Sequence, residues 1–188
     1  MEMKRVIKAS GISSEALAII GNRALSSEAL AMMDNKALSL KEIAFFESES
    51  RDETMAIGEG LASRLKAFDV VLLIGCLGAG KTEFARGVVS FFGAGRDVCS
   101  PSYKIINRYE GKTPVYHMDF YRIKERGEIF DIGLEEIFAE KAIFIVEWPE
   151  LGIDFFKKFY LAELKPVSEN RREIRLFESV EVKPFQDE

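Results

Sequence analysis

Apolar residues follow two different periodicities along the chain from about residue 41 onward. The run Val70–Ile74 is apolar at every position, which is typical of a central strand covered by helices on both faces. After a glycine-rich loop, Phe84, Val88 and Phe91 recur at i, i+4 and i+7, so one face of a helix is apolar. Gly93 follows where helices commonly end in a left-handed residue. This segment predicts a strand, a loop and a helix in direct succession.

Shorter apolar segments predict most of the remaining elements. Further strands are expected at residues 42–46, 103–109, 115–119, 142–147, 159–165 and 173–177. Residues 50–53 (SRDE) form a capping-box pattern that begins one helix, and a second helix is expected from Gly127 to about Lys141. The turn at residues 110–113 indicates an antiparallel pair inside an otherwise parallel sheet, and residues 168–170 indicate a hairpin.

The loop after Val70–Ile74 carries the sequence GCLGAGKT, which matches the phosphate-binding P-loop pattern G-x-x-x-x-G-K-[ST]. Small residues let successive backbone N–H groups point into one concavity, and the following helix presents its positive N-terminal end to the same anion. Lys81 is expected to reach the outer phosphates, and the Thr82 hydroxyl is expected to coordinate Mg²⁺. A glycine-rich turn before an ordinary helix is the alternative. The residues expected to bind the nucleotide are Gly75, Gly78, Ala79, Gly80, Lys81, Thr82 and Glu83.

These elements and the loop predict an α/β fold: a P-loop NTPase-like three-layer sandwich with a mostly parallel sheet, antiparallel additions and a C-terminal hairpin. This domain is assigned to residues 41–188. Residues 1–40 form a separate extension, because 13–25 (SSEALAIIGNRAL) and 26–38 (SSEALAMMDNKAL) are near-copies, identical at 9 of 13 positions. A 13-residue period turns each copy by about 220°, which favours two short helices over one continuous helix. The role of the extension is left open, with a partner-binding helix as one option.

Composition and charge narrow the class of protein. The 188 residues are 47% hydrophobic and 30% charged, as in globular proteins. The absence of a long apolar run or a secretory signal predicts a cytoplasmic protein with no membrane association. Cys76 and Cys99 are then expected to be free thiols. The net charge of −5 argues against a bulk basic surface for nucleic acid, although a local patch within residues 157–175 stays open.

Two carboxylates stand where a P-loop enzyme needs them. Glu147 directly follows the apolar run 142–146, and Asp119 directly follows 115–118. Because ligands gather at the carboxyl ends of strands in such sheets, both acids are predicted to face the loop as catalytic residues, with Glu147 also a Mg²⁺ ligand. Capping a helix or facing solvent is the alternative for each. His117 shares a strand face with Asp119 and is expected to orient a neighbour. Trp148 is expected to have a partly exposed ring suited to stacking or an interface, with a core position as the alternative.

The segment Ser100–Tyr103 and the residue Cys76 can each be explained either by function or by structure alone. Ser100–Tyr103 follows the P-loop helix at the distance where other P-loop proteins place a switch loop that senses the outer phosphate, but an ordinary Ser-Pro turn explains it as well. Cys76 lies inside the loop near positive charge, which would favour an oxidisable thiol. A small filler residue is the preferred interpretation of Cys76.

Together the motifs resemble the TsaE family, bacterial ATPases that take part in forming threonylcarbamoyladenosine in transfer RNA. The resemblance covers about residues 41–178 and depends on five blocks in order. These blocks are GCLGAGKT (75–82), SPSYKIINRY (100–109), YHMDFYR (116–122), DIGLEE (131–136) and VEWPE (146–150). The P-loop is generic, whereas YH-x-D-x-YR followed by EWPE is specific.

This resemblance implies an ATPase that does not itself transfer the threonylcarbamoyl group. It implies ATP and Mg²⁺ as cofactors, docking on a complex of the transferase and its pseudo-enzyme partner, and indirect association with tRNA. Lys81 and Thr82 would bind phosphate and Mg²⁺, Glu147 would be the acid on the metal side, Asp119 a second essential acid, and Trp148 part of the functional surface. Ser100–Tyr103 would correspond to a switch-like loop.

Three residues depart from the family pattern. Cys76 stands where Asp is usual, Glu83 where a second Thr is common, and Ser102 where Thr is usual. Glu83 adds negative charge near the phosphates, which would weaken affinity or alter turnover. Two other functions stay open from the sequence: a P-loop kinase for a small molecule, and a binding module gated by nucleotide occupancy.

Overall fold

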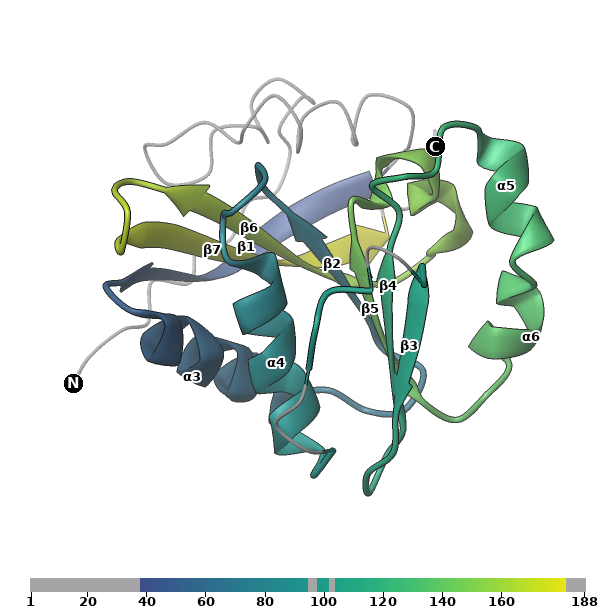
Figure 1. Cartoon of the computed structure of the whole chain (residues 1–188), viewed down its shortest axis with the longest axis horizontal. Coiled ribbons are helices and arrows are strands. Elements are labelled where there is room, and N and C mark those ends of the chain that lie inside the picture. Colours follow the sequence, from purple (N-terminus) through teal and green to yellow (C-terminus); the bar gives the residue numbers. More distant parts are fainter. Residues whose placement is uncertain (1–37, 95–97, 102–103, 182–188) are drawn as a thin grey trace, which may run out of the picture.

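The computed structural model describes residues 38–94, 98–101 and 104–181 of the chain. A seven-stranded sheet in the order β1-β7-β6-β2-β5-β4-β3 forms its centre (Figure 1). The strands are β1 Leu38–Ser48, β2 Val70–Ile74, β3 Ile106–Tyr109, β4 Val115–Asp119, β5 Ile143–Glu147, β6 Tyr160–Pro166 and β7 Arg172–Glu181. The helices are α3 Arg51–Ala62, α4 Lys81–Phe91, α5 Arg126–Asp131 and α6 Leu134–Phe138, with 3-10 turns η1 Pro149–Leu151 and η2 Ile153–Phe155.

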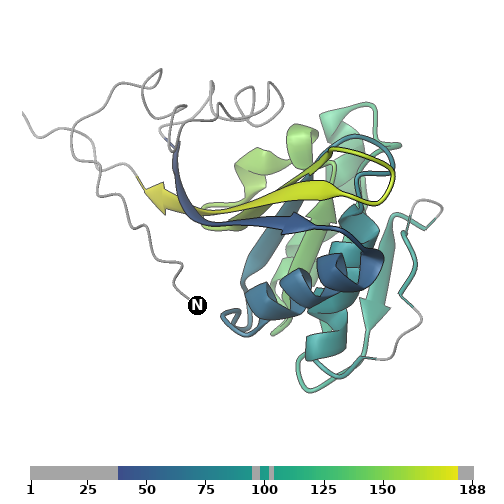
Figure 2. The ribbon, with the colours of Figure 1, turned by 90° about the vertical axis from the view of Figure 1, so that its left-hand side faces the viewer.

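Helices cover both faces of the sheet, as the continuous apolar run in β2 predicts. Val71 and Leu73 belong to a core shared with residues of α3 and α4, whereas Leu72 and Ile74 belong to a second core shared with α5 and α6. Figure 1 shows the two helix pairs on either side of the sheet, and Figure 2 shows α3 beside the long ribbon of β1 and β7. The α/β three-layer arrangement is therefore confirmed.

The sheet has a parallel centre and antiparallel margins. Strand β2 pairs in parallel with β5 and β6, and β4 pairs in parallel with β5. The antiparallel pairs are β3 with β4, β6 with β7, and β1 with β7. The expected antiparallel pair and C-terminal hairpin are both present, and parallel and antiparallel pairs are equal in number. The carboxyl ends of β2, β4, β5 and β6 consequently lie at one edge of the sheet.

Helices α3 and α4 approach closely because glycines stand at their contact. A Cβ added to Gly58 would lie 2.2 Å from the carbonyl oxygen of Phe84, and one added to Gly87 would lie 2.0 Å from the carbonyl oxygen of Met55. Neither helix could carry a side chain there without moving. This contact fixes the position of α4, whose first residue is Lys81.

Some predicted boundaries were wrong. The single helix expected from Gly127 to about Lys141 is two short helices, because Gly133 between them adopts a left-handed conformation with φ 72°. Strand β1 is longer than the expected 42–46, and β3 begins at Ile106 because Ile105 adopts φ 64°. The predicted repeat helices lie outside the described residues, and the division at residue 40 stays a prediction. None of the helices that the structure describes is long and apolar enough to cross a membrane.

Candidate phosphate-binding site

The loop between β2 and α4 has the backbone shape that its glycines permit. Gly75, Gly78 and Gly80 have φ of 141°, 80° and 100°, values that residues with side chains rarely adopt. Gly80 is the N-cap of α4 and provides no capping side chain, so the N–H groups of the first helical turn have no cap from that residue. A loop of this shape at a helix N-terminus presents backbone donors to an anion.

Lys81 is buried beside this loop. Its Nζ donates to the carbonyl oxygens of Gly75 at 2.5 Å and Cys76 at 3.1 Å, and it lies 4.0 Å from the centre of the Trp148 ring. Burial lowers the pKa of Lys81 below its ordinary value, although the negative charges of Glu147 and Asp119 oppose that shift. The ammonium group therefore lies in a setting where a further anion would stabilise its charge.

The two predicted acids lie side by side at the carboxyl edge of the sheet. Asp119 and Glu147 are paired across β4 and β5, and both are buried. The Thr82 hydroxyl donates to Oε1 of Glu147 at 3.1 Å, which connects the end of β5 with the start of α4. The structure thus brings Thr82 and Glu147 into direct contact, and both acids act electrostatically on Lys81.

His117 holds the Glu147 carboxylate from the neighbouring strand. Its Nε2 lies 2.9 Å from Oε1 of Glu147, and the ring is fully buried. Nδ1 has no hydrogen-bond partner among the described residues. Because a carboxylate only accepts, the Nε2 proton is the one donated and Nδ1 needs no proton. This placement agrees with the expected orienting role.

Asp119 connects the sheet to the loop that follows α4. Its Oδ2 accepts from the Ser100 hydroxyl at 3.0 Å, and its Oδ1 accepts from the Tyr121 backbone N–H at 3.0 Å. Ser100 belongs to the segment predicted as a switch loop, whereas Ser102 and Tyr103 lie outside the described residues. A movement of the loop that carries Ser100 would therefore reach Asp119 through the Ser100 hydroxyl.

Trp148 covers Lys81 in a conformation that its sequence did not indicate. The residue has φ 55° and is half-buried, and its ring lies 5.0 Å from that of Tyr121, centre to centre. The partial exposure was expected. A ring suited to stacking was also expected, but its partners Lys81 and Tyr121 were missed, because no local pattern signals a contact between residues so far apart in the chain.

Two of the three residues that depart from the family pattern, Cys76 and Glu83, lie within the described residues. Glu83 forms an ion pair with Arg86 one turn along α4, and Arg86 also donates to the carbonyl oxygen of Val98 at 2.8 Å. The negative charge of Glu83 is thus partly balanced within its own helix. Cys76 is exposed and, like Cys99, a free thiol as expected.

The donor set suits Mg²⁺ bound together with phosphate. The described residues contain no group of three or more His, Cys, Asp and Glu side chains that could hold a metal alone. Mg²⁺ in such sites typically takes one or two protein oxygens and completes its shell with phosphate oxygens and water. The Thr82 hydroxyl and the Glu147 carboxylate, 3.1 Å apart, are the groups that could provide those oxygens.

Comparisons with known proteins decide the family. A sequence model described as "Threonylcarbamoyl adenosine biosynthesis protein TsaE" matches residues 48–174. The chain belongs to the TsaE family. The tRNA threonylcarbamoyladenosine biosynthesis protein TsaE of Treponema pallidum is 30% identical over 128 residues, which cover 68% of this chain and 95% of that protein. The crystal structure of YdiB from Bacillus subtilis superposes with a TM-score of 0.61 and 32% identity, covering 74% of this chain and 86% of that one.

The chain matches only part of some other TsaE proteins. The TsaE protein of Bacillus subtilis (strain 168) is 44% identical over 101 residues, and the match covers 53% of this chain and 63% of that protein. For the TsaE protein of Rickettsia conorii the identity is 38%, and 59% of that protein is covered. The residues matched by the family model include the P-loop, His117, Asp119, Glu147 and Trp148.

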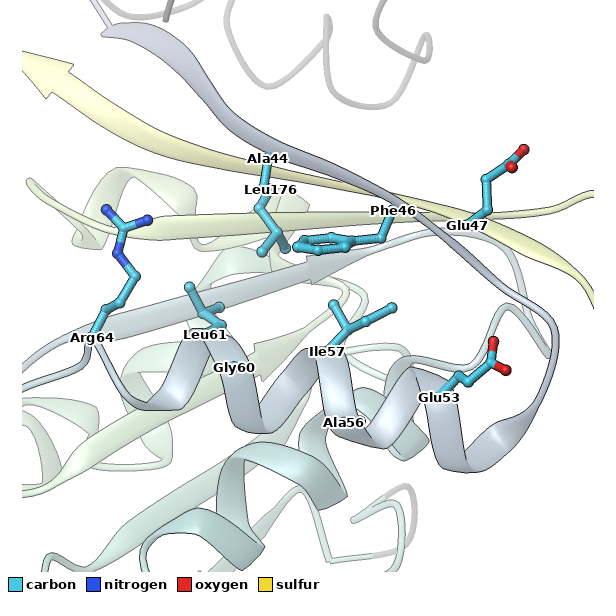
Figure 3. A pocket seen from close by; sticks show the side chains of 10 residues that line it. All are labelled: Ala44, Phe46, Glu47, Glu53, Ala56, Ile57, Gly60, Leu61, Arg64 and Leu176. Carbon is cyan, nitrogen blue, oxygen red and sulfur yellow. The ribbon is translucent and has the colours of Figure 1, made fainter. Parts of the chain in front are cut away.

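A separate groove lies between α3 and the sheet, and some of its lining residues fall outside residues 48–174, which the family model matches. It has a volume of about 510 Å³ between α3 and strands β1 and β7, with Phe46, Ile57, Leu61 and Leu176 among its apolar lining (Figure 3). Figure 3 shows Glu53 toward one end and Arg64 toward the other. The groove shares no residue with the P-loop, so it is not part of the TsaE phosphate site.

Proposed function

We propose that this chain binds and hydrolyses ATP with Mg²⁺ as an accessory protein in forming N6-threonylcarbamoyladenosine at position 37 of tRNA. The observation that carries the proposal is the contact between the Thr82 hydroxyl and the Glu147 carboxylate. It joins a phosphate-binding loop to a strand-end acid, which is the pair of oxygen groups that holds Mg²⁺ in P-loop enzymes. Family membership supports the tRNA role.

Each residue of the site has a proposed task. The backbone N–H groups of Gly78, Gly80 and the first turn of α4 bind the phosphates, and Lys81 neutralises their outer charge. The N–H of Ala79 instead donates to the carbonyl oxygen of Cys76 at 3.1 Å, which holds the loop in shape. Thr82 and Glu147 hold Mg²⁺, which would polarise the phosphate undergoing attack. Asp119, with Ser100 as its partner, positions the attacking water. His117 keeps the Glu147 carboxylate turned toward Thr82.

The proposed partners are the transferase and pseudo-enzyme subunits of the threonylcarbamoylation complex. Association with tRNA is proposed to be indirect, since the net charge of −5 provides no bulk basic surface. The cytoplasm is the proposed compartment.

A reconstitution experiment tests this function. A mixture of the bacterial threonylcarbamoylation proteins lacking only its ATPase should regain tRNA modification over repeated turnovers when this chain is added. Lys81→Ala should abolish the rescue, whereas Lys112→Ala, which removes the same charge from an exposed turn, should leave it intact. Failure of the wild-type chain to restore modification, or full rescue by Lys81→Ala, would contradict the proposal.

Replacing Glu147 separates an ATPase from the two alternatives. Glu147→Gln keeps the hydrogen-bonding shape but removes the charge beside Thr82, so turnover should fall by about 100-fold or more while ATP still binds. Glu135→Gln removes an exposed carboxylate of α6 as the control. A nucleotide-gated module would instead retain full partner-dependent function with Glu147→Gln, and a kinase would yield a phosphorylated small molecule.

A further inference from the structure

Arg172 approaches the phosphate-binding loop from the side away from Glu147. It is the first residue of β7 and pairs with Pro166 at the end of β6, which runs beside β2. A Cβ added to Gly80 would lie 3.3 Å from Cδ of Arg172, 3.5 Å from its Nε and 3.6 Å from its Cζ. The guanidinium therefore lies against the N-cap of α4. The residue is 7% exposed.

The partners of this buried guanidinium are neutral. One terminal nitrogen of Arg172 donates to the Thr54 hydroxyl at 2.7 Å and lies 3.5 Å from the carbonyl oxygen of Ser50. The Thr54 hydroxyl also contacts the Ser48 hydroxyl at 2.7 Å. By contrast, the neighbouring arginines form ion pairs: a terminal nitrogen of Arg171 lies 2.6 Å from Oε1 of Glu47, and one of Arg175 lies 2.6 Å from Oε2 of Glu42.

Within the described part of the chain, no carboxylate forms an ion pair with Arg172. A buried charge without a counter-charge is costly, and a cation beside the positive end of a helix dipole adds to that cost. An anion bound at the N-terminus of α4 would remove both penalties at once. Arginine also suits phosphate because its planar donors can hold two oxygens.

We propose that Arg172 is a second cation of the phosphate site and binds a phosphate oxygen of the nucleotide. The proposal rests on the proposed function, because it takes the ligand of the loop to be a nucleotide with Mg²⁺. Lys81 then acts from one side of the loop and Arg172 from the other, at Gly80. A purely structural cross-link between the start of β7 and the start of α3 is the competing role.

Calorimetry tests this proposal by measuring how tightly the Arg172→Gln and Arg172→Lys variants bind Mg-ATP, Mg-ADP and inorganic pyrophosphate. Arg172→Gln should weaken all three about 10- to 100-fold, the usual effect of losing a charge-assisted hydrogen bond. Arg171→Gln is the matched control. It removes the same charge from the adjacent, exposed position and should change the affinities by less than about twofold.

Arg172→Lys separates charge from structure. It keeps the positive charge but lacks the planar pair of donors, so it should recover part of the affinity that Arg172→Gln loses. A structural role predicts that Thr54→Val, which removes the hydroxyl partner, lowers affinity as much as Arg172→Gln. That result would overturn the proposal, as would unchanged pyrophosphate affinity in Arg172→Gln or a failure of both Arg172 variants to fold.

Lys81→Ala distinguishes this inference from the function on which it rests. If the wild-type chain binds no ATP, or Lys81→Ala binds it normally, the proposed function fails. If Lys81→Ala loses ATP while Arg172→Gln binds it like the wild type, only the role of Arg172 fails.

Discussion

Lys81 has three partners that compete for one ammonium group. Two are loop carbonyls, which also define the shape of the loop, and the third is the face of Trp148. A phosphate would attract the ammonium more strongly than a ring or a neutral carbonyl, because it adds the Coulomb attraction between opposite charges. Nucleotide binding should therefore change the surroundings of Trp148.

Trp148 should report this change directly, because it is the only tryptophan in the chain. Titrating Mg-ATP should alter its fluorescence intensity or emission wavelength with a saturable dependence on nucleotide. Lys81→Met removes the cation from the ring and should change the emission before any nucleotide is added. Identical spectra for the two proteins, with and without ATP, would show that the stacked arrangement does not persist in solution.

The lowered pKa of Lys81 predicts a pH dependence of binding. In the free protein, burial lowers the pKa of Lys81, whereas a bound phosphate would raise the pKa of Lys81 again. Once the pH exceeds the lowered pKa, binding of ATP is therefore accompanied by uptake of a proton. Affinity should then fall as the pH rises from the lowered pKa of Lys81 in the free protein towards its higher pKa in the complex. Calorimetry in two buffers of different ionisation enthalpy measures the uptake. Lys81→Met should show neither the uptake nor the additional loss of affinity.

The sequence predicts those site residues whose positions are set by a local motif or by the end of a strand. Lys81 and Thr82 come from the loop motif, and Asp119 and Glu147 from their places at strand ends. It could not reach Trp148 over Lys81 or Arg172 against Gly80. Those contacts depend on how distant elements pack, and an αL tryptophan or a buried arginine has no signature in its neighbours.

At the scale of elements, the glycines between α3 and α4 should be required for the fold. Gly58→Ala places a methyl group 2.2 Å from a backbone oxygen, so it should lower the free energy of unfolding by about 1–3 kcal/mol or more and displace α4. Gly60→Ala is the matched control in the same helix. No atom lies within 4 Å of its added Cβ, so it should raise stability by about 0.5–1 kcal/mol.

Urea unfolding followed by circular dichroism measures both changes. Because α4 carries Lys81 and Thr82, Gly58→Ala should also weaken ATP binding, whereas Gly60→Ala should not. Equal stability of the two variants would mean that the helices can separate at little cost.

The interrupted helix shows where element boundaries escape sequence patterns. Apolar spacing across residues 127–141 suits a helix throughout, and a single glycine inside such a pattern is tolerated. Gly133 instead takes a left-handed conformation that also starts α6. Whether an internal glycine continues a helix or breaks it depends on which faces of the flanking segments must pack on the sheet. Ile129 of α5 and Leu134 of α6 are both buried against it.

Over the whole molecule, the order of strands explains how distant segments meet at one site. The P-loop strand β2 lies between β5, which carries Glu147, and β6, which leads through a hairpin to Arg172. Rules for doubly wound sheets predict the acids at this edge from the sequence. They did not place Arg172, because an antiparallel strand beyond the parallel centre lies outside those rules.

Removing residues 1–37 should leave both the domain and its nucleotide site intact. Within the described residues, both hydrophobic cores and the hydrogen bonds given for the loop are formed from Leu40 onward. The truncated chain, beginning at strand β1, should therefore unfold at a midpoint within about 4 °C of the full chain, roughly the change that 1 kcal/mol produces at this size. Its affinity for Mg-ATP should be unchanged within about twofold.

The same truncation also distinguishes a passive extension from a partner-binding one. If the extension recruits the transferase complex, the truncated chain should bind ATP normally yet fail to restore tRNA modification at concentrations where the full chain succeeds. Restoration at equal concentrations would instead confine recruitment to the domain itself. Loss of ATP binding would contradict the division of the chain at about residue 40, because the first segment would then be needed to complete the site.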